Sequence, residues 1–235
     1  MKLFSLLFFF IISHQLKASG IISYSDAIKS LGYVQESPKV EICPEVKTSD
    51  QTIASSSLQN DDGRSVVVSV LSYEYLVEIF DILANQKQIP FKYPETGCYA
   101  RAHEMARIMD SKGITSAKIF MDGDLRLSTD NSPKGFVEWS YHVAPLVKVN
   151  INGKEVVYVI DPSIFDRPVP VDDWYKLLKY NKAPAFTYYT SRFNFKTEDK
   201  LEVRNEYKAK DLRETKSKME EFLKIQEQRA VGEKQ

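Results

Sequence analysis

Three side chains in this sequence are of the types needed for thiol chemistry: Cys98, His142 and Asp161. A cysteine becomes a strong nucleophile when a neighbouring base takes its proton, and histidine often serves as that base. A carboxylate beside the imidazole holds its tautomer and stabilises its charged form. Together they would form a thiol acyl-transfer site, with Cys98 as nucleophile, provided that the fold brings the three side chains together.

The thiol lies at the expected start of a helix. Cys98 follows a turn that carries Pro94 and Gly97, and the apolar residues behind it recur at the spacing of one helix face: Ala102, Met105, Ala106 and Met109. Gly113 is typical of a helix end. In a first helical turn, unpaired N–H groups and the helix dipole favour an anion, which here is the nucleophilic thiolate. The alternative is a buried structural cysteine.

A predicted β-hairpin places the imidazole beside the carboxylate. Two runs rich in aromatic and β-branched residues flank Asn152-Gly153, which is the strongest short-range hairpin signal. With these two residues as the loop, His142 and Asp161 fall on the same face, one diagonal step apart, with β-carbons on the order of 7–8 Å apart. Pro145 has no N–H to donate, which predicts a bulge or a sheet edge at that position.

His103 is the rival base. It follows Cys98 on the same helix, but a position five residues on points roughly 140° away, so we expect a packed or surface histidine. Trp139 and Tyr141 flank His142. Core packing is one interpretation of these two aromatic residues, and a wall of the substrate-binding channel is the other.

The first 20 residues have the form of a secretory signal peptide. Lys2 supplies the positive start, Leu3–Ile12 is almost entirely apolar, and Ala18 to Gly20 offers small residues for cleavage. The apolar run falls short of the ~20 residues that span a bilayer. We therefore expect a secreted or periplasmic protein with no membrane anchor after signal removal.

The composition excludes several classes of partner. The chain has 32 basic and 32 acidic residues, and loss of Lys2 and Lys17 with the signal would bring the net charge to about −2, which does not indicate nucleic-acid binding.

Two cysteines do not make a disulfide framework. Of three histidines, His14 leaves with the signal, so a histidine-based zinc site is not expected. We expect a monomer that needs neither metal nor cofactor.

The mature chain divides by composition into three parts. Residues 21–64 are polar and end in a loop signature, which fits either an N-terminal arm or a pro-segment cleaved near Arg64. Cys43 in this part is a spare thiol or a partner for Cys98. Residues 65–196 have the patterns of a folded catalytic domain. Residues 197–235 are highly charged and predict a solvated helix on the domain, with sparse apolar contacts at Met219, Phe222 and Leu223.

Within the catalytic domain the remaining patterns predict a helix at 76–85, a strand at 117–121, a turn at 122–124 and a strand at 186–195.

Three separated motifs resemble one enzyme family. They are Tyr93-Pro94 with Gly97 to Met105, then Trp139 to Ala144, then Ile160 to Ser163 with Pro170-Val171. These closely resemble the bacterial protein-glutaminases, exported enzymes that hydrolyse the side-chain amide of glutamine residues within proteins. The resemblance spans roughly Leu71 to Tyr188 and implies an α+β fold, similar to the papain and transglutaminase core, with the nucleophile helix packed on an antiparallel β-sheet.

The resemblance also implies the chemistry. The family's catalytic residues fall on Cys98, His142 and Asp161, and its members are made with an inhibitory pro-region. The expected activity is deamidation of glutamine in protein or peptide substrates through a Cys98 thioester, with Trp139 and Tyr141 as candidate substrate contacts. Transfer to an amine, as in transglutaminases, and peptide-bond cleavage are alternatives that use the same triad. A catalytically inactive binding module is a further alternative.

Overall fold

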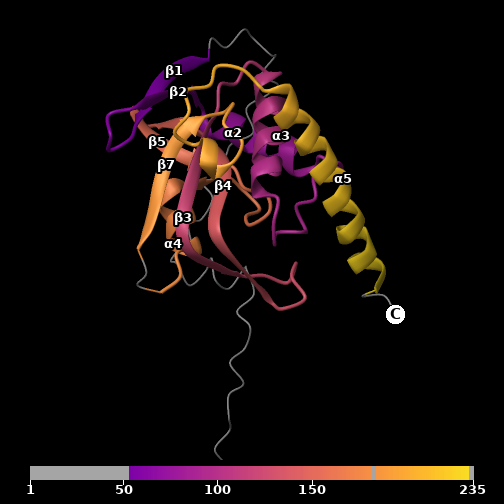
Figure 1. The fold of residues 1–235 in the computed structure, drawn as a ribbon. Helices are drawn as coiled ribbons and strands as arrows, with labels where there is room; N and C mark the ends of the chain where they lie inside the picture. The colour runs from indigo at the N-terminus through magenta and orange to yellow at the C-terminus, as the bar shows by residue number, and fades with distance from the viewer. Residues whose placement is uncertain (1–52, 182–183, 233–235) are drawn as a thin grey trace, which may run out of the picture. The chain divides into compact units, whose positions relative to one another are not determined.

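The centre of the fold is a mixed β-sheet, which a computed structural model describes for residues 53–181 and 184–232. The described residues contribute seven strands, in the order β1-β2-β4-β3-β7, with β5 beside β4 and β6 beside β5 (Figure 1). The strands are β1 (Ala54–Gln59), β2 (Ser65–Leu71), β3 (Ala117–Ser128), β4 (Phe136–Ile151), β5 (Lys154–Val159), β6 (Val169–Pro170) and β7 (Ala185–Ser191). All pairings are antiparallel except the short one between β2 and β4.

The described residues form four α-helices around this sheet: α2 (Tyr73–Ala84), α3 (Cys98–Asp110), α4 (Val171–Leu178) and α5 (Ala209–Gly232). α3 packs against β4, α5 runs alongside α3, and α4 contacts β3, β5 and β6 (Figure 1). This is the expected α+β arrangement, with the helix that begins at Cys98 lying on the strand that carries His142.

The main core lies between α2, α3 and strands β4 and β5. The helical spacing of α2 buries Leu76, Ile79, Phe80 and Leu83, as the sequence predicts. Met105 and Met109 of α3 join the same cluster. Each large apolar side chain buried in this way contributes roughly 1.5–3 kcal/mol. The core therefore holds the start of α3 in a fixed position on the sheet.

The turn predicted at residues 122–124 is wrong, because these residues lie inside β3. The pairing of β3 with β4 shifts register between Asp122 and Leu125, so the strand continues through a bulge instead of turning. Gly123 makes the bulge possible: its φ is 145°, and a β-carbon there would lie 2.9 Å from the carbonyl oxygen of Pro184. The strand predicted at 117–121 thus extends to Ser128.

The sheet begins ahead of Ser65, where the sequence predicts the catalytic domain to start. β1 pairs with β2 along its whole length. The Asn60 side-chain amide then exchanges two hydrogen bonds of 2.8 Å with the backbone of Tyr189, which ties the hairpin turn to β7. Arg64 donates to the carbonyl oxygen of Leu201. Residues 54–64 are therefore built into the domain.

Several expectations fall on residues outside those described: the signal peptide at 1–20, Cys43 and most of the extension at 21–64. Within the described ranges, none of the helices has the length and apolar composition needed to cross a bilayer.

Candidate active site

The nucleophile position is set by a sharp entry into α3. Gly97 is the N-cap residue, with a left-handed φ of 79°, and Cys98 is the first residue of the helix. Gly97 also lies under an aromatic ring, since a β-carbon there would be 2.5 Å from the Phe222 ring. Cys98 is a free thiol that is 5% exposed. The helix start thus presents the thiol from a backbone turn that only glycine accommodates.

The hairpin brings His142 to Asp161. The β4–β5 register runs from Leu146 opposite Val159 to Ile151 opposite Lys154, which confirms the predicted pairing. The chain then leaves the ladder, and Asp161 Oδ2 lies 2.8 Å from His142 Nε2. Both side chains are buried, at 3% and 1% exposure. An isolated charge buried to this extent would be costly, so each group stabilises the other.

Pro145 marks where β5 leaves β4. Its carbonyl oxygen accepts from the N–H of Ile160 at 2.9 Å, and its ring nitrogen faces the same edge, where β5 has already ended. The predicted edge is therefore present on that side. The predicted bulge is absent at this position, because Pro145 keeps regular register with Lys118 of β3.

Trp174 fixes the carboxylate from the other side. Its indole N–H donates to the same Oδ2 of Asp161 at 3.0 Å, from the fully buried face of α4. The Trp174 ring also lies against the imidazole of His142, with centroids 5.8 Å apart. Asp161 is thus held by two donors, and the carboxylate cannot rotate away from the imidazole without losing one of them.

Trp139 packs on His142. The two rings are 4.7 Å apart with an interplanar angle of 31°. The indole N–H of Trp139 donates to the carbonyl oxygen of Pro94 at 3.0 Å. Trp139 therefore links the imidazole to the segment that precedes Cys98. Tyr141 lies on the thiol side: it packs against the small cluster that contains Cys98.

The charges of the site favour an imidazolium. Burial by itself would lower the pKa of His142, but the charge and hydrogen bond of Asp161, with smaller contributions from Cys98, raise it to about 9. Burial opposes ionisation of Asp161 as well, yet His142 and Trp174 hold the pKa of Asp161 below its usual value. Since Nε2 donates to the carboxylate, Nδ1 is the ring nitrogen that is left for a proton exchange with the thiol.

The thiol of Cys98 and the imidazole of His142 are close, but they do not form a hydrogen bond of full geometry. Cys98 contributes to the pKa of His142 by charge and hydrogen bonding, whereas His142 Nδ1 has no partner at full hydrogen-bond geometry among the described residues. Such a gap is common before substrate binds, because catalytic hydrogen bonds are often long until substrate closes the site.

Arg101 is a further charged group of the site that sequence reasoning missed. Its guanidinium is 1% exposed and donates through Nη1 to the carbonyl oxygens of Tyr93 and Thr96, at 2.9 and 2.7 Å. Burial lowers the pKa of Arg101, and the charges of Cys98 and Asp161 oppose that effect. Its spacing could have indicated a place in the site, because a residue three positions after Cys98 shares a helix face with it.

His103 does not belong to the site. It lies on the far side of α3, where its Nδ1 is 2.9 Å from the buried amine of Lys118 and its ring packs against Phe195 and Tyr207. Burial and the neighbouring Lys118 lower the pKa of His103 to about 2, so it stays neutral. The predicted packed role is confirmed. In the part of the chain that the structure describes, no cluster of three metal-ligating side chains occurs.

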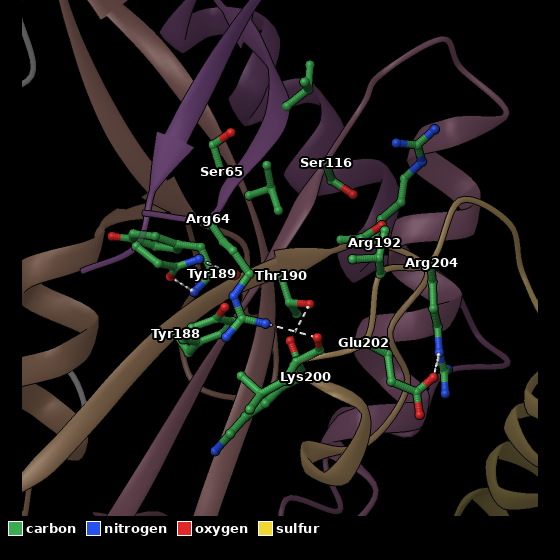
Figure 2. A pocket seen from close by; sticks show the side chains of 16 residues that line it. Arg64, Ser65, Ser116, Tyr188, Tyr189, Thr190, Arg192, Lys200, Glu202 and Arg204 are labelled. Atoms are coloured by element: carbon green, nitrogen blue, oxygen red, sulfur yellow. Dashed lines mark hydrogen bonds and ion pairs between the residues drawn. The ribbon is translucent and has the colours of Figure 1, made fainter. Parts of the chain in front are cut away.

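A cavity of about 280 Å³ lies away from the triad, between the β1–β2 hairpin, β7 and residues 200–204 (Figure 2). Its basic side chains already have acidic partners: Arg64 pairs with Asp62, and Arg204 pairs with Glu202. This cavity is therefore not a continuation of the catalytic site.

Comparisons with known proteins agree with this geometry. A family model described as glutaminase matches residues 76–178, the range that contains the triad and Trp174. A crystal structure of protein-glutaminase is 28% identical, with a TM-score of 0.55, and the match covers 65% of this chain and 90% of that chain. The NMR structure of protein-glutaminase from Chryseobacterium proteolyticum is 27% identical, with a TM-score of 0.55. That match covers 65% of this chain and 88% of the relative. Among curated proteins, no significant match was found. The chain is thus similar to the protein-glutaminases in sequence and in fold.

Proposed function

We propose that this protein is an exported protein-glutamine deamidase that acts through a thioester on Cys98. The observation that carries the proposal is the buried His142–Asp161 pair, 2.8 Å apart, beside a free thiol at a helix start. The match to a family model described as glutaminase supports the side-chain amide of glutamine as the substrate class. The solved relatives are protein-glutaminases, which supports a protein or peptide as the carrier of that glutamine.

The chemistry follows from the proton positions. Cys98 as thiolate attacks the amide carbon, and a first-turn N–H, such as that of Cys98, stabilises the oxyanion. The imidazolium of His142 gives its Nδ1 proton to the departing nitrogen, which leaves as ammonia. His142, now neutral, takes a proton from water, and the hydroxide releases glutamate and regenerates the thiol. Asp161 stays ionised and stabilises each imidazolium stage.

Trp139 and Tyr141 would border the bound glutamine side chain. Burial and the nearby Cys98 raise the pKa of Tyr141, which supports a position at the thiol. Trp139 packs on His142 and has its indole N–H engaged with Pro94, so it would offer substrate a ring face and no hydrogen bond.

Export and activation complete the proposal. The signal-like residues 1–20 support export. A pro-segment within residues 21–53 would fit the family, whereas a cut near Arg64 would fall inside a hairpin turn that is bonded to Leu201 and beside Tyr189. Cleavage ahead of Ala54 is the arrangement that leaves the sheet intact.

The test is ammonia release from a glutamine-containing protein by the full chain, measured before and after proteolytic removal of the residues ahead of Ala54. Ammonia, with substrate chains that gain the mass difference between amide and carboxylic acid, supports the proposal. An incorporated amine would instead identify transfer chemistry, and a cleaved backbone would identify a peptidase. Either of those results, or no ammonia at all, would reject deamidation as the main reaction.

A further inference from the structure

The segment that delivers the nucleophile is held from outside by the C-terminal helix. Residues 92–97, which we call the nucleophile loop, lead directly into Cys98. Helix α5 lies beyond the residues that match the glutaminase family model, which end at 178. We propose that α5 is a positioning element of the active site, which acts through Phe222, Gln226 and Arg229 on the nucleophile loop. This inference rests on the proposed function for its kinetic consequence.

The three α5 residues form one contact surface. Phe222, Gln226 and Arg229 are spaced at i, i+4 and i+7, so they share one face of the helix. All three contact the nucleophile loop, and Phe222 is buried there. A helix that only covered the core would need apolar residues along this face. Here two of the three residues are polar, and both have partners in the loop.

Phe222 contacts the loop at its most constrained residue. Its ring lies so close to Gly97 that a β-carbon on Gly97 would be 2.5 and 2.7 Å from two ring atoms. Its ring also packs on Tyr93, with centroids 5.1 Å apart. Gly97 has a left-handed φ of 79° and sets the direction in which α3 starts. The ring therefore fills the space into which the Gly97 turn would otherwise relax.

Gln226 and Arg229 hold the rest of the loop. The Gln226 side-chain oxygen accepts from the N–H of Lys92 at 2.8 Å. Arg229 Nη1 lies 2.6 Å from Glu95 Oε1, and its guanidinium lies 4.6 Å from the centre of the Tyr93 ring. The second carboxylate oxygen of Glu95 is buried without a partner among the described residues, so loss of Arg229 would leave that carboxylate poorly compensated.

The inner side of the same loop is bonded to the catalytic machinery. Arg101 donates to the carbonyl oxygens of Tyr93 and Thr96, and Trp139 donates to that of Pro94. The loop is thus held between catalytic groups on one side and α5 on the other. Loss of the outer support would let Cys98 shift relative to His142, and a misplacement of about 1 Å costs on the order of 100-fold in rate.

The test compares full-length Phe222→Ala, Arg229→Gln and a matched control, Lys224→Ala, which changes an exposed residue of the same helix. We expect Phe222→Ala to lower kcat about tenfold, with KM within about twofold, because the substrate contacts remain while the thiol is misplaced. Arg229→Gln should show a smaller loss of the same kind, and Lys224→Ala should match the wild type.

A second readout does not depend on the reaction. The rate at which iodoacetamide alkylates Cys98, followed by mass on the Cys98 peptide, should fall at least about threefold in Phe222→Ala, because thiolate formation needs His142 nearby. If Phe222→Ala fails to fold, Phe222→Leu keeps an apolar side chain there and carries the same comparison. Loss of alkylation rate with the fold intact supports positioning even if the substrate class were wrong.

The proposal is overturned if the folded Phe222 variants lose thermal stability but keep wild-type kcat and wild-type alkylation of Cys98. That result would make α5 a structural cover only. Equal losses in Lys224→Ala would overturn it as well, because the effect would then not depend on the contact surface.

Discussion

Cys98, the proposed nucleophile, lies between two regions of different physical character. On the sheet side, His142, Asp161 and Trp174 are fully buried, and charge and hydrogen bonds set their ionisation. On the α5 side, Arg229 and Glu95 are about one-quarter exposed, at 28% and 27%, and they act on loop geometry. In the proposed mechanism, the first region supplies the proton chemistry and the second supplies the placement of the thiol. Substitutions in the two regions should therefore differ in size and in kinetic signature.

The largest effect is expected at Asp161. Asp161→Asn should lower kcat about 10³- to 10⁴-fold, because an amide no longer enforces the Nε2–H tautomer or stabilises the imidazolium. It should also lower the pKa of His142, since burial then acts without the opposing carboxylate. The alkaline limb of the pH–rate profile should move to lower pH. A limb that stays in place would show that His142 is not the titrating group.

Trp174→Phe keeps the aromatic ring and removes one donor to Asp161. We expect a loss of about 1–3 kcal/mol in the free energy of unfolding, because a buried acceptor loses a partner. kcat should fall about tenfold, as is typical when a residue that orients a catalytic group is lost. Urea unfolding and steady-state kinetics measure the two effects. An unchanged kcat would mean that the His142 hydrogen bond alone orients the carboxylate.

The pH dependence of stability tests the sheet side without substrate. His142 has its pKa raised from 6.5 to about 9 on folding, so its contribution is fully present below pH 6.5 and is lost as pH rises through about 9. The unfolding free energy of the wild type should fall across this window. His142→Gln should lack that slope, and equal slopes in both proteins would contradict the buried ion pair.

The smallest effect is expected at the partly exposed ion pair of the α5 side. Exposed pairs contribute about 0–1 kcal/mol and are screened by salt. Raising the salt concentration should therefore reduce the ratio of kcat between the wild type and Arg229→Gln about twofold. The ratio of kcat between the wild type and Asp161→Asn should not change with salt. Equal salt sensitivity of both regions would remove the distinction between them.

The pairing of His142 with Asp161 could be predicted from the sequence, whereas the contacts of α5 could not. Asn152-Gly153 fixes a two-residue turn, and strand periodicity then carries the register to His142 and Asp161. The apolar spacing after Cys98 likewise predicts α3. These inferences rest on local geometry, for which neighbouring residues carry the information.

Trp174, Arg101 and the α5 contacts depend on how distant segments meet. Trp174 reaches Asp161 only because the chain turns after β5, and Phe222 meets Gly97 across 125 positions of sequence. The bulge at Gly123 could not be predicted for the same reason. A glycine between two aspartates has the pattern of a turn unless the neighbouring strand is known. Sequence patterns identify these residues but do not show which distant residues they contact.

Ammonia release from a glutamine-containing protein, compared between the wild-type chain and Cys98→Ala after cleavage ahead of Ala54 in both, decides whether Cys98 is the nucleophile. We expect ammonia and intact substrate chains that carry glutamate in place of glutamine, both abolished in Cys98→Ala. Ammonia release that persists in a folded Cys98→Ala variant would contradict the assignment of Cys98 as the nucleophile.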